Sequence, residues 1–342
     1  MRQPNPIAQG MALQILVVVA ITIGMIVVAT GAGQAQTLTV LHTFASGSNG
    51  ANPISGLTRD AAGNLYGTTE FGGAGCLNSG CGLVYKVTHH GSAWLETTLY
   101  TFTGAPDAAF PVGRVVFGPD GALYGTTRGG GSDSCSGGCG TVFKLQPPPR
   151  ACGSLLCPWR ETILYSFTSP ADGAFPQGEV AFDQSGNLYG TTEGGGAGPC
   201  RESEYPGCGT VFKLTHNPDG SWSKSTLYSF QGGATDGQFP LAAVVLDQAG
   251  NLYGTTPTGG GTGCPDQNNE GCGIVFELSP SGSGWTESIP YDFTGGSDGA
   301  IPTAGLIVDS QGNLYGSALY GGQGSGTVFE LTSGQGGWNF SV

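Results

Sequence analysis

The chain has 342 residues, among them 64 Gly and 21 Pro, with only 10% charged residues and a formal net charge of −13. Glycine makes up about 7% of an average protein, so this excess needs a structural cause. The 16 Phe, 12 Tyr and 5 Trp argue against a disordered chain, because disordered segments contain few aromatic residues. No Gly-X-Y period and no long amphipathic helix pattern is present, which excludes collagen, helix bundles and coiled coils. The acidic balance, without any Lys/Arg cluster, argues against nucleic acid as a partner.

The N-terminus has the order of an export signal. A basic residue near the start precedes an apolar stretch from Ala12 to Ala29, and small residues follow as far as Ala35. This order predicts a signal peptide over residues 1–36 and a repeat domain over residues 37–342. The alternative is an uncleaved anchor, because about 18 apolar residues can span a bilayer. In both cases we expect a secreted or extracytoplasmic protein that meets the membrane only through this segment.

Ten Cys form five close pairs in the sequence, which is typical of an oxidising compartment. The pairs are Cys76 with Cys81, Cys135 with Cys139, Cys152 with Cys157, Cys200 with Cys208, and Cys264 with Cys272. We predict a disulfide within each pair. Structural zinc is the alternative, but it needs four ligands brought together, and none of the four His lies beside a pair. Each disulfide closes a short loop and should contribute about 2–2.5 kcal/mol in the chain-entropy model.

One sequence unit occurs five times. Its central tetrapeptide is Asn-Leu-Tyr-Gly, with Ala in place of Asn in the second copy. The tyrosines of the five copies are Tyr66, Tyr124, Tyr189, Tyr253 and Tyr315, at steps of 58, 65, 64 and 62 residues. Each copy follows an apolar run and a Gly turn, and precedes a Gly-rich loop, a run like Gly-Thr-Val-Phe-Lys-Leu, and a Trp with an aromatic run. Self-similarity at a fixed period indicates a repeat architecture.

The four apolar runs of each unit, called A to D, have the length and composition of β-strands. The Asp-x-x-Gly-Asn segment between A and B is typical of a hairpin turn. The sequence therefore predicts an all-β, five-bladed β-propeller of four-stranded antiparallel blades. A solenoid is the alternative, but solenoid repeats of about 20–45 residues rarely hold four strands.

The ends of the chain predict how the ring closes. Residues Thr37–Phe44 are similar to a D strand such as Thr98–Phe102, whereas the last unit stops early, at Trp338–Val342. We expect the N-terminal strand to complete the last blade and close the propeller. Closure would remove an open sheet edge that could otherwise pair with another chain.

These repeats resemble the GloVer tandem-repeat proteins, which are exported bacterial proteins with a variable mode of surface attachment. The resemblance rests on the pattern Asp-x-x-Gly-Asn-Leu-Tyr-Gly-Thr-Thr followed by Gly-Thr-Val-Phe-Lys-Leu, and extends from Thr37 to Val342. It implies an extracytoplasmic location and a repeat architecture, and it implies no chemical activity. Some relatives carry a C-terminal anchor segment; we expect none here, which leaves the N-terminal segment as the anchor candidate. The Asp-Gly turns are also similar to those of NHL-type propellers.

The strand order predicts one candidate binding face. In an up-and-down blade the B–C loops and D–A connections share a face, opposite the A–B and C–D turns. Four D–A carboxylates would then ring a central channel: Asp107, Asp172, Asp236 and Asp298. Oxygen ligands suit calcium, so a cation or polar-ligand site is one interpretation. The alternative is that each Asp forms a turn before its strand. The acidic residues of the A–B turns are expected to be structural: Asp60, Asp120, Asp183, Asp247 and Asp309.

Residues that break the repeat are better ligand-binding candidates, because a structural unit repeats whereas a single site need not. They are Glu70, Arg128 and Glu193 after the B strands, and Arg201, Glu202, Glu204, Tyr205, Asp266, Asn268, Asn269 and Glu270 in the B–C loops. The candidate ligand-binding set comprises Asp107, Asp172, Asp236, Asp298, Glu70, Glu193, Arg201 and Tyr205. The five Trp share one repeat position and are expected to pack the blades.

The sequence predicts no catalytic residue, since it contains neither a GxSxG nor an HExxH motif. We expect a monomeric binding or structural module for a glycan or a surface protein. No cofactor is indicated, with calcium as the alternative. The competing hypothesis is a glycan-active hydrolase or lyase. It would use Glu70 or Glu193 with a D–A carboxylate, because glycoside hydrolysis needs two acids about 5–10 Å apart.

Overall fold

The computed structural model describes residues 38–76, 79–149, 157–168, 170–201, 206–261, 264, 271–334 and 336–342. Leu41–Val342 form one compact unit. The helices within the described ranges are three short 3-10 turns, η1 (Gly47–Asn49), η2 (Pro170–Asp172) and η3 (Gly233–Thr235). Within the same ranges no helix has the length and apolarity needed to cross a membrane.

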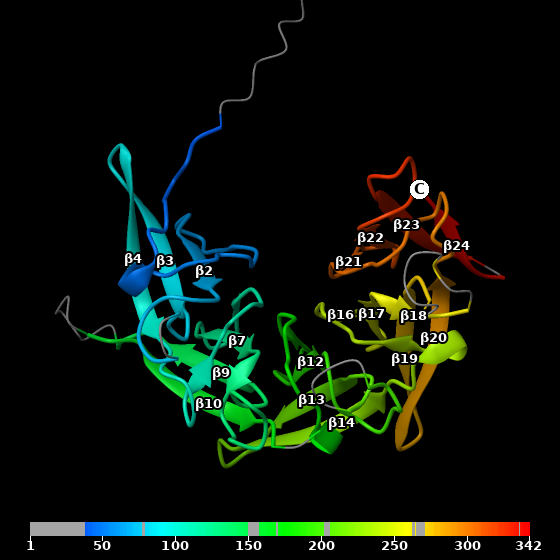
Figure 1. Cartoon of the computed structure of the whole chain (residues 1–342), viewed down its shortest axis with the longest axis horizontal. Coiled ribbons are helices and arrows are strands. Elements are labelled where there is room, and N and C mark those ends of the chain that lie inside the picture. Colours follow the sequence, from blue (N-terminus) through cyan, green and yellow to red (C-terminus); the bar gives the residue numbers. More distant parts are fainter. Residues whose placement is uncertain are drawn as a thin grey trace, which may run out of the picture. The chain divides into compact units, whose positions relative to one another are not determined.

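Five four-stranded antiparallel sheets follow one another along the chain (Figure 1). Sheet 1 consists of β1 (Thr58–Arg59), β2 (Leu65–Thr69), β3 (Leu83–His90) and β4 (Ala93–Thr101). Sheet 2 consists of β6 (Val116–Phe117), β7 (Leu123–Thr127), β9 (Thr141–Gln146) and β10 (Arg160–Ser166). Sheet 3 consists of β11 (Ala181–Phe182), β12 (Leu188–Thr192), β13 (Thr210–His216) and β14 (Trp222–Ser229). Sheet 4 consists of β16 (Val245–Leu246), β17 (Leu252–Thr256), β19 (Ile274–Ser281) and β20 (Gly284–Asp292). Sheet 5 consists of β21 (Ile307–Val308), β22 (Leu314–Ala318), β23 (Thr327–Gly334) and β24 (Gly337–Ser341). The predicted all-β fold with four-stranded antiparallel sheets is confirmed.

The core lies between consecutive sheets. A Phe just after the fourth strand of one sheet meets, edge to face, a Phe on the third strand of the next. The pairs are Phe102–Phe143, Phe167–Phe212, Phe230–Phe276 and Phe293–Phe329, with ring centroids 5.1–5.3 Å apart. All eight rings are buried. Aromatic pairs of this geometry add about 0.5–1.5 kcal/mol beyond their buried area, so they are a principal contact between neighbouring sheets.

Threonine hydroxyls form a second link between consecutive sheets. The first Thr of each Leu-Tyr-Gly-Thr-Thr strand donates to a backbone carbonyl of the next unit. The pairs are Thr68–Gly113, Thr126–Gly178, Thr191–Ala242 and Thr255–Ala304, at 2.7–3.1 Å. A buried hydroxyl needs a partner, so these bonds also fix how adjacent sheets are aligned.

A backbone feature that sequence patterns did not reveal occurs at the residue before each D–A proline. Asn52, Phe110, Phe175, Phe239 and Ile301 all have φ between 58° and 61°. This left-handed conformation is unfavourable for bulky residues, most of all for a β-branched Ile. Bonds to two loops hold it in place: the Phe110 N–H donates to the Cys81 carbonyl at 2.8 Å, and the Phe110 carbonyl accepts from the Arg128 N–H at 3.0 Å. Both bonds recur at Phe175 and Ile301, and Phe239 makes the first of them.

The predicted closure by the N-terminal strand is not confirmed. Residues 38–45 form no strand, and sheet 5 takes its fourth strand, β24, from the C-terminus. Trp338 pairs with Ser333 in sheet 5 as Trp94 pairs with His89 in sheet 1. The C-terminal residues therefore already form the first half of the fourth strand of sheet 5. The pairing of β24 stops at Glu330, which leaves the first residues of β23 without a fourth-strand partner.

Candidate functional site

The A–B turn aspartates make a repeated turn. Asp60 accepts hydrogen bonds from the backbone N–H groups of Ala62 and Asn64, from the Asn64 amide at 2.6 Å and from the Tyr66 hydroxyl at 3.0 Å. Desolvation raises the pKa of Asp60, but these hydrogen bonds outweigh it, so the pKa lies below its usual value. Asp183, Asp247 and Asp309 make the same set of contacts. These contacts are structural, as expected for this series.

The D–A aspartates close the connection between sheets. Asp298 accepts from the Thr294 N–H at 2.7 Å, the Thr294 hydroxyl at 2.8 Å and the Tyr291 hydroxyl at 3.2 Å. Asp107 and Asp236 receive the equivalent tyrosine hydroxyl and loop amide. Their oxygens are thus used within the turn, in line with the turn interpretation. Among the described residues no group of three or more His, Cys, Asp or Glu is placed to hold a metal ion. A ligand-binding role for these carboxylates stays a prediction.

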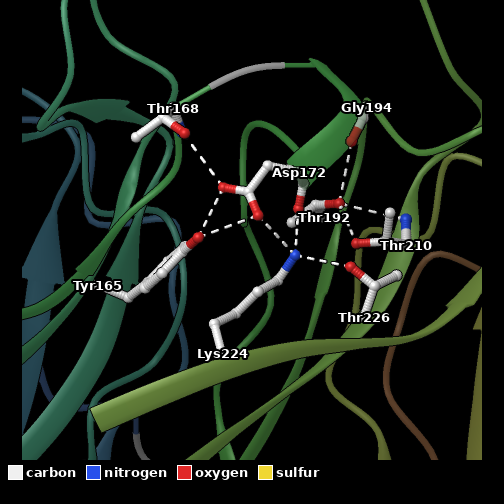
Figure 2. Close-up of polar contacts among 8 residues, drawn as sticks. All are labelled: Tyr165, Thr168, Asp172, Thr192, Gly194, Thr210, Lys224 and Thr226. Carbon is white, nitrogen blue, oxygen red and sulfur yellow. Dashed lines mark hydrogen bonds and ion pairs between the residues drawn. The ribbon is translucent and has the colours of Figure 1, made fainter. Parts of the chain in front are cut away.

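Asp172 differs from the other D–A aspartates because a lysine meets it (Figure 2). It accepts from the Tyr165 hydroxyl at 2.9 Å and from the Thr168 N–H at 3.3 Å. The Lys224 ammonium of β14 donates to Asp172 Oδ1 at 2.8 Å, and also to the Asp172 carbonyl and the Thr226 hydroxyl. The two side chains are only 5% and 18% exposed. This ion pair joins the connection after sheet 2 to the fourth strand of sheet 3.

Three other sheets carry a glutamate at the repeat position of Lys224, namely Glu96, Glu161 and Glu287, and the last two face a D–A aspartate. Burial, and secondly the charge of Asp107, raises the pKa of Glu161 to about 7. Burial and Asp236 do the same for Glu287, whose pKa is also about 7. One oxygen of each of these two glutamates is buried without a hydrogen-bond partner. Glu161 therefore faces Asp107, and Glu287 faces Asp236, at the position where Lys224 of sheet 3 faces Asp172.

The residues that follow the second strands form two small polar groups. The Asn52 amide donates to Glu70 at 2.5 Å. Glu193 accepts from the Gln177 amide at 2.5 Å and lies 3.7 Å from the Arg128 guanidinium, which sits over the Phe175 ring. The structure thus brings Arg128 and Glu193 together, while Glu70 belongs to the first sheet.

The remaining predicted residues lie in the long B–C loops. Arg201 is exposed. The other charged or polar candidates lie outside the described residues: Glu202, Glu204, Tyr205, Asp266, Asn268, Asn269 and Glu270.

Disulfides join the described cysteine pairs of these loops. They are Cys76–Cys81, Cys135–Cys139, Cys200–Cys208 and Cys264–Cys272. Cys152 lies outside the described residues, as does the predicted signal segment 1–36. Two-stranded ladders, β5 (Ala108–Ala109) with β8 (Gly129–Gly130) and β15 (Gly237–Gln238) with β18 (Thr258–Gly259), tie B–C loops to D–A connections. The loop face is therefore braced both covalently and by backbone hydrogen bonds.

A cavity of about 700 Å³ opens on this loop face beside sheet 5. Its lining includes Cys264, Ser297, Ile301 and Tyr320 together with glycines of both adjoining loops. Backbone bonds between Ala300 and Tyr320 hold the two loops together at 3.0–3.1 Å. The Tyr320 side chain is 52% exposed, so its ring is available to a ligand. The repeat pattern alone does not single out Tyr320, although Phe71 occupies this repeat position in sheet 1.

The Trp series packs as predicted at three interfaces. Each Trp lies against the second-strand Tyr of the preceding sheet. The pairs are Tyr66–Trp159, Tyr189–Trp285 and Tyr253–Trp338, with ring centroids 5.7–6.5 Å apart. At the fourth interface, Trp222 and Tyr124 make no such ring contact within the described part of the chain, and both line a cavity.

The molecule is thus an all-β repeat protein whose loop face is held by disulfides. The Gloeobacter/Verrucomicrobia repeat matches the sequence at residues 23–264 and again at 160–342, and the chain belongs to this family. A comparison with curated proteins finds no match. Among solved structures the chain is similar to an oxidoreductase (glucose dehydrogenase) of Thermus thermophilus, with 16% identity, a TM-score of 0.46 and 83% of each chain covered. It is also similar to a polysaccharide lyase, an ulvan lyase, with 9% identity, a TM-score of 0.44, and 83% of this chain and 68% of that one covered.

Proposed function

We propose that the protein is an exported binding module, a monomer without a cofactor, that takes a glycan on its loop face. The observation that carries this proposal is the 700 Å³ cavity beside the exposed ring of Tyr320. Binding sites of this size combine an aromatic or apolar surface with a few polar groups. Glycine backbone and the Ser297 hydroxyl supply those groups here. The four loop disulfides and the family support export to an oxidising compartment.

The test is retention of soluble glycans by the exported, oxidised protein, with product mass recorded in the same samples. We expect an intact glycan to be retained, and Tyr320→Ala to weaken retention at least about tenfold, which corresponds to about 1.4 kcal/mol. Phe71→Ala is the matched control, because Phe71 holds the same repeat position in sheet 1. Equal loss in both variants, or no retained glycan, would count against the loop-face site.

Glycan cleavage is the second candidate function. Its support is the pair of Arg128 and Glu193, which lie 3.7 Å apart on the same face. Hydrolysis also needs a second carboxylate about 5–10 Å from Glu193, and Asp172 in the D–A connection is the candidate for that role. Shortened or unsaturated products that disappear in Glu193→Gln would establish the enzyme, and their absence with wild-type protein would reject it.

For the scaffold, the proposal is a closed five-bladed ring in which sheet 5 docks on sheet 1 as consecutive sheets dock on each other. Val328 is 73% exposed, whereas the same position is fully buried in the other four sheets. Leu57, on the facing side of sheet 1, is 45% exposed, whereas Val115 is fully buried. The ring centroids of Phe44 and Tyr85 are 4.8 Å apart and the rings meet edge to face. Phe102 and Phe143 make the same contact between sheets 1 and 2.

Ring closure predicts a large effect of a charge at an exposed position. Val328→Asp should lower the unfolding temperature by several degrees if Val328 is covered in solution, because a buried unpaired charge is costly. Leu95→Asp, at a position that is exposed in every sheet, is the comparison. An unchanged melting temperature for Val328→Asp would contradict closure.

A further inference from the structure

The cavity between sheets 2 and 3 lies at the edge opposite the loop face. Asp120 belongs to the A–B turn of sheet 2, and His216 and Trp222 flank the C–D turn of sheet 3. In antiparallel four-stranded sheets these turns share one edge, away from the B–C loops. The cavity has a volume of about 610 Å³. It is therefore a separate site from the cavity beside Tyr320.

This cavity occurs where the repeat is broken. At three other interfaces a Trp of one sheet lies against a Tyr of the preceding one. Here the Tyr124 ring contacts Phe182 at 5.0 Å, and the Trp222 ring contacts His216 at 4.9 Å. The same two contacts occur in sheet 1, as Tyr66–Phe117 and His89–Trp94, so they do not replace the Tyr–Trp contact. Here Trp222 packs against the buried cluster that contains Tyr124, and both rings line the cavity. The Tyr–Trp contact that recurs at three interfaces is explained by packing. The cavity that replaces it between sheets 2 and 3 needs a separate explanation.

An ion pair between Lys144 and Asp120 lies beside the aromatic rings of the cavity. The Lys144 ammonium lies 2.6 Å from Asp120, and the Tyr124 hydroxyl donates to the same carboxylate at 3.1 Å. The Asp120 side chain is 39% exposed and that of Lys144 is 23% exposed, so both can reach a ligand. Because the two charges neutralise each other, the cavity favours a ligand that is polar but uncharged.

We propose that this cavity binds a neutral sugar unit of a glycan. The C–H face of a pyranose ring is apolar and packs on aromatic side chains such as Trp222 and Phe182. The hydroxyls at its edge can donate to Asp120 and accept from Lys144. Ligand sites typically combine an apolar surface with a few convergent polar groups and a volume of about 300–1,000 Å³, and the cavity fits that description.

Calorimetry on the exported, oxidised full chain tests the proposal with cellohexaose, xylohexaose and laminarihexaose as neutral probes and an oligogalacturonate as the acidic probe. We expect at least one neutral probe to bind saturably. Trp222→Ala should weaken it at least about tenfold, or about 1.4 kcal/mol. Trp222→Phe, which keeps an aromatic ring, should retain binding within about threefold, which guards against a folding defect in the alanine variant.

Trp285→Ala is the matched control, because Trp285 has the same repeat position but packs on Tyr189. We expect it to lower stability and leave binding unchanged. The proposal is overturned if no neutral probe binds at millimolar concentration, if only the acidic probe binds, or if both alanine variants lose binding equally. Binding that is lost in Tyr320→Ala but kept in Trp222→Ala would also overturn it, and would favour the loop-face site instead.

Discussion

The Lys224 ammonium of sheet 3 lies 2.8 Å from Asp172 Oδ1 in the connection that leaves sheet 2 (Figure 2). The corresponding positions of the neighbouring interfaces pair Asp107 with Glu161 and Asp236 with Glu287. One repeat position thus carries an attractive pair at one interface and a repulsive pair at two. This difference sets how the stability of each interface should depend on charge and pH.

Removal of the lysine charge should destabilise the protein strongly. In Lys224→Met the Asp172 carboxylate would keep Tyr165 and the Thr168 N–H but lose its counter-ion. Breaking a buried ion pair costs about 3–5 kcal/mol, and we expect a value at or below the lower end because two hydrogen bonds remain. Denaturant unfolding at pH 7 measures this difference.

The exposed pair Arg114 and Glu179 provides the control, because its side chains are 42% and 28% exposed. Arg114→Met should cost no more than about 1 kcal/mol, as is usual for solvent-accessible pairs. Equal losses in the two variants would show that burial of the Lys224 pair has no special effect on stability.

The two glutamates predict a loss of stability as the pH rises. Their pKa of about 7 in the folded protein lies above the ordinary value of 4.5, so the folded state binds more protons than the unfolded state between these values. The free energy of unfolding therefore decreases as pH rises through about 7. One pKa unit corresponds to about 1.4 kcal/mol, and allowing for partial exposure we expect roughly 1–2 kcal/mol per group.

Glu161→Gln and Glu287→Gln test this effect. Each should raise the free energy of unfolding at pH 8, have little effect at pH 5, and remove part of the slope between the two. Asp60 and Asp183 have lowered pKa values, so their contribution is lost only on acidification below about 4 and falls outside this range. A slope that is the same in the double variant and in the wild type would contradict the assignment.

Local signals were enough to predict the units of this fold. Asp60 and its turn could be predicted because their partners lie within six residues, and Cys135–Cys139 because the pair is separated by four. The pair of Lys224 and Asp172 could not, because its partners are 52 residues apart and meet only when two sheets align. The left-handed backbone conformation of Ile301 could not be predicted either, because a β-branched residue disfavours it. It is held by a hydrogen bond to the Cys272 carbonyl of another sheet.

Loss of one loop disulfide should weaken both the loop and the next sheet. The carbonyl of Cys139 accepts a hydrogen bond from the Phe175 N–H at 2.9 Å, so this disulfide fixes an acceptor used by sheet 3. The double variant Cys135→Ala/Cys139→Ala should lose about 2 kcal/mol, as expected for a loop of this length. Chemical denaturation without reductant gives the value. Wild-type protein in dithiothreitol should lose more, because every reducible bridge opens, and an unchanged wild type would argue against a stabilising role.

The glycine that follows Cys139 should tolerate no side chain. A Cβ at Gly140 would lie 2.4 Å from the Thr127 carbonyl oxygen and 2.6 Å from Pro176 Cδ of sheet 3, and its φ of 90° is itself unfavourable for alanine. Gly121 has a φ of 75° with nothing within 4 Å of a Cβ, so Gly121→Ala isolates the backbone cost. We expect about 1 kcal/mol for Gly121→Ala, and at least about 2 kcal/mol more for Gly140→Ala because backbone and proline atoms cannot move aside cheaply. Thermal unfolding of both variants compares them directly. If the losses are equal, close contact between sheets 2 and 3 at this glycine does not limit stability.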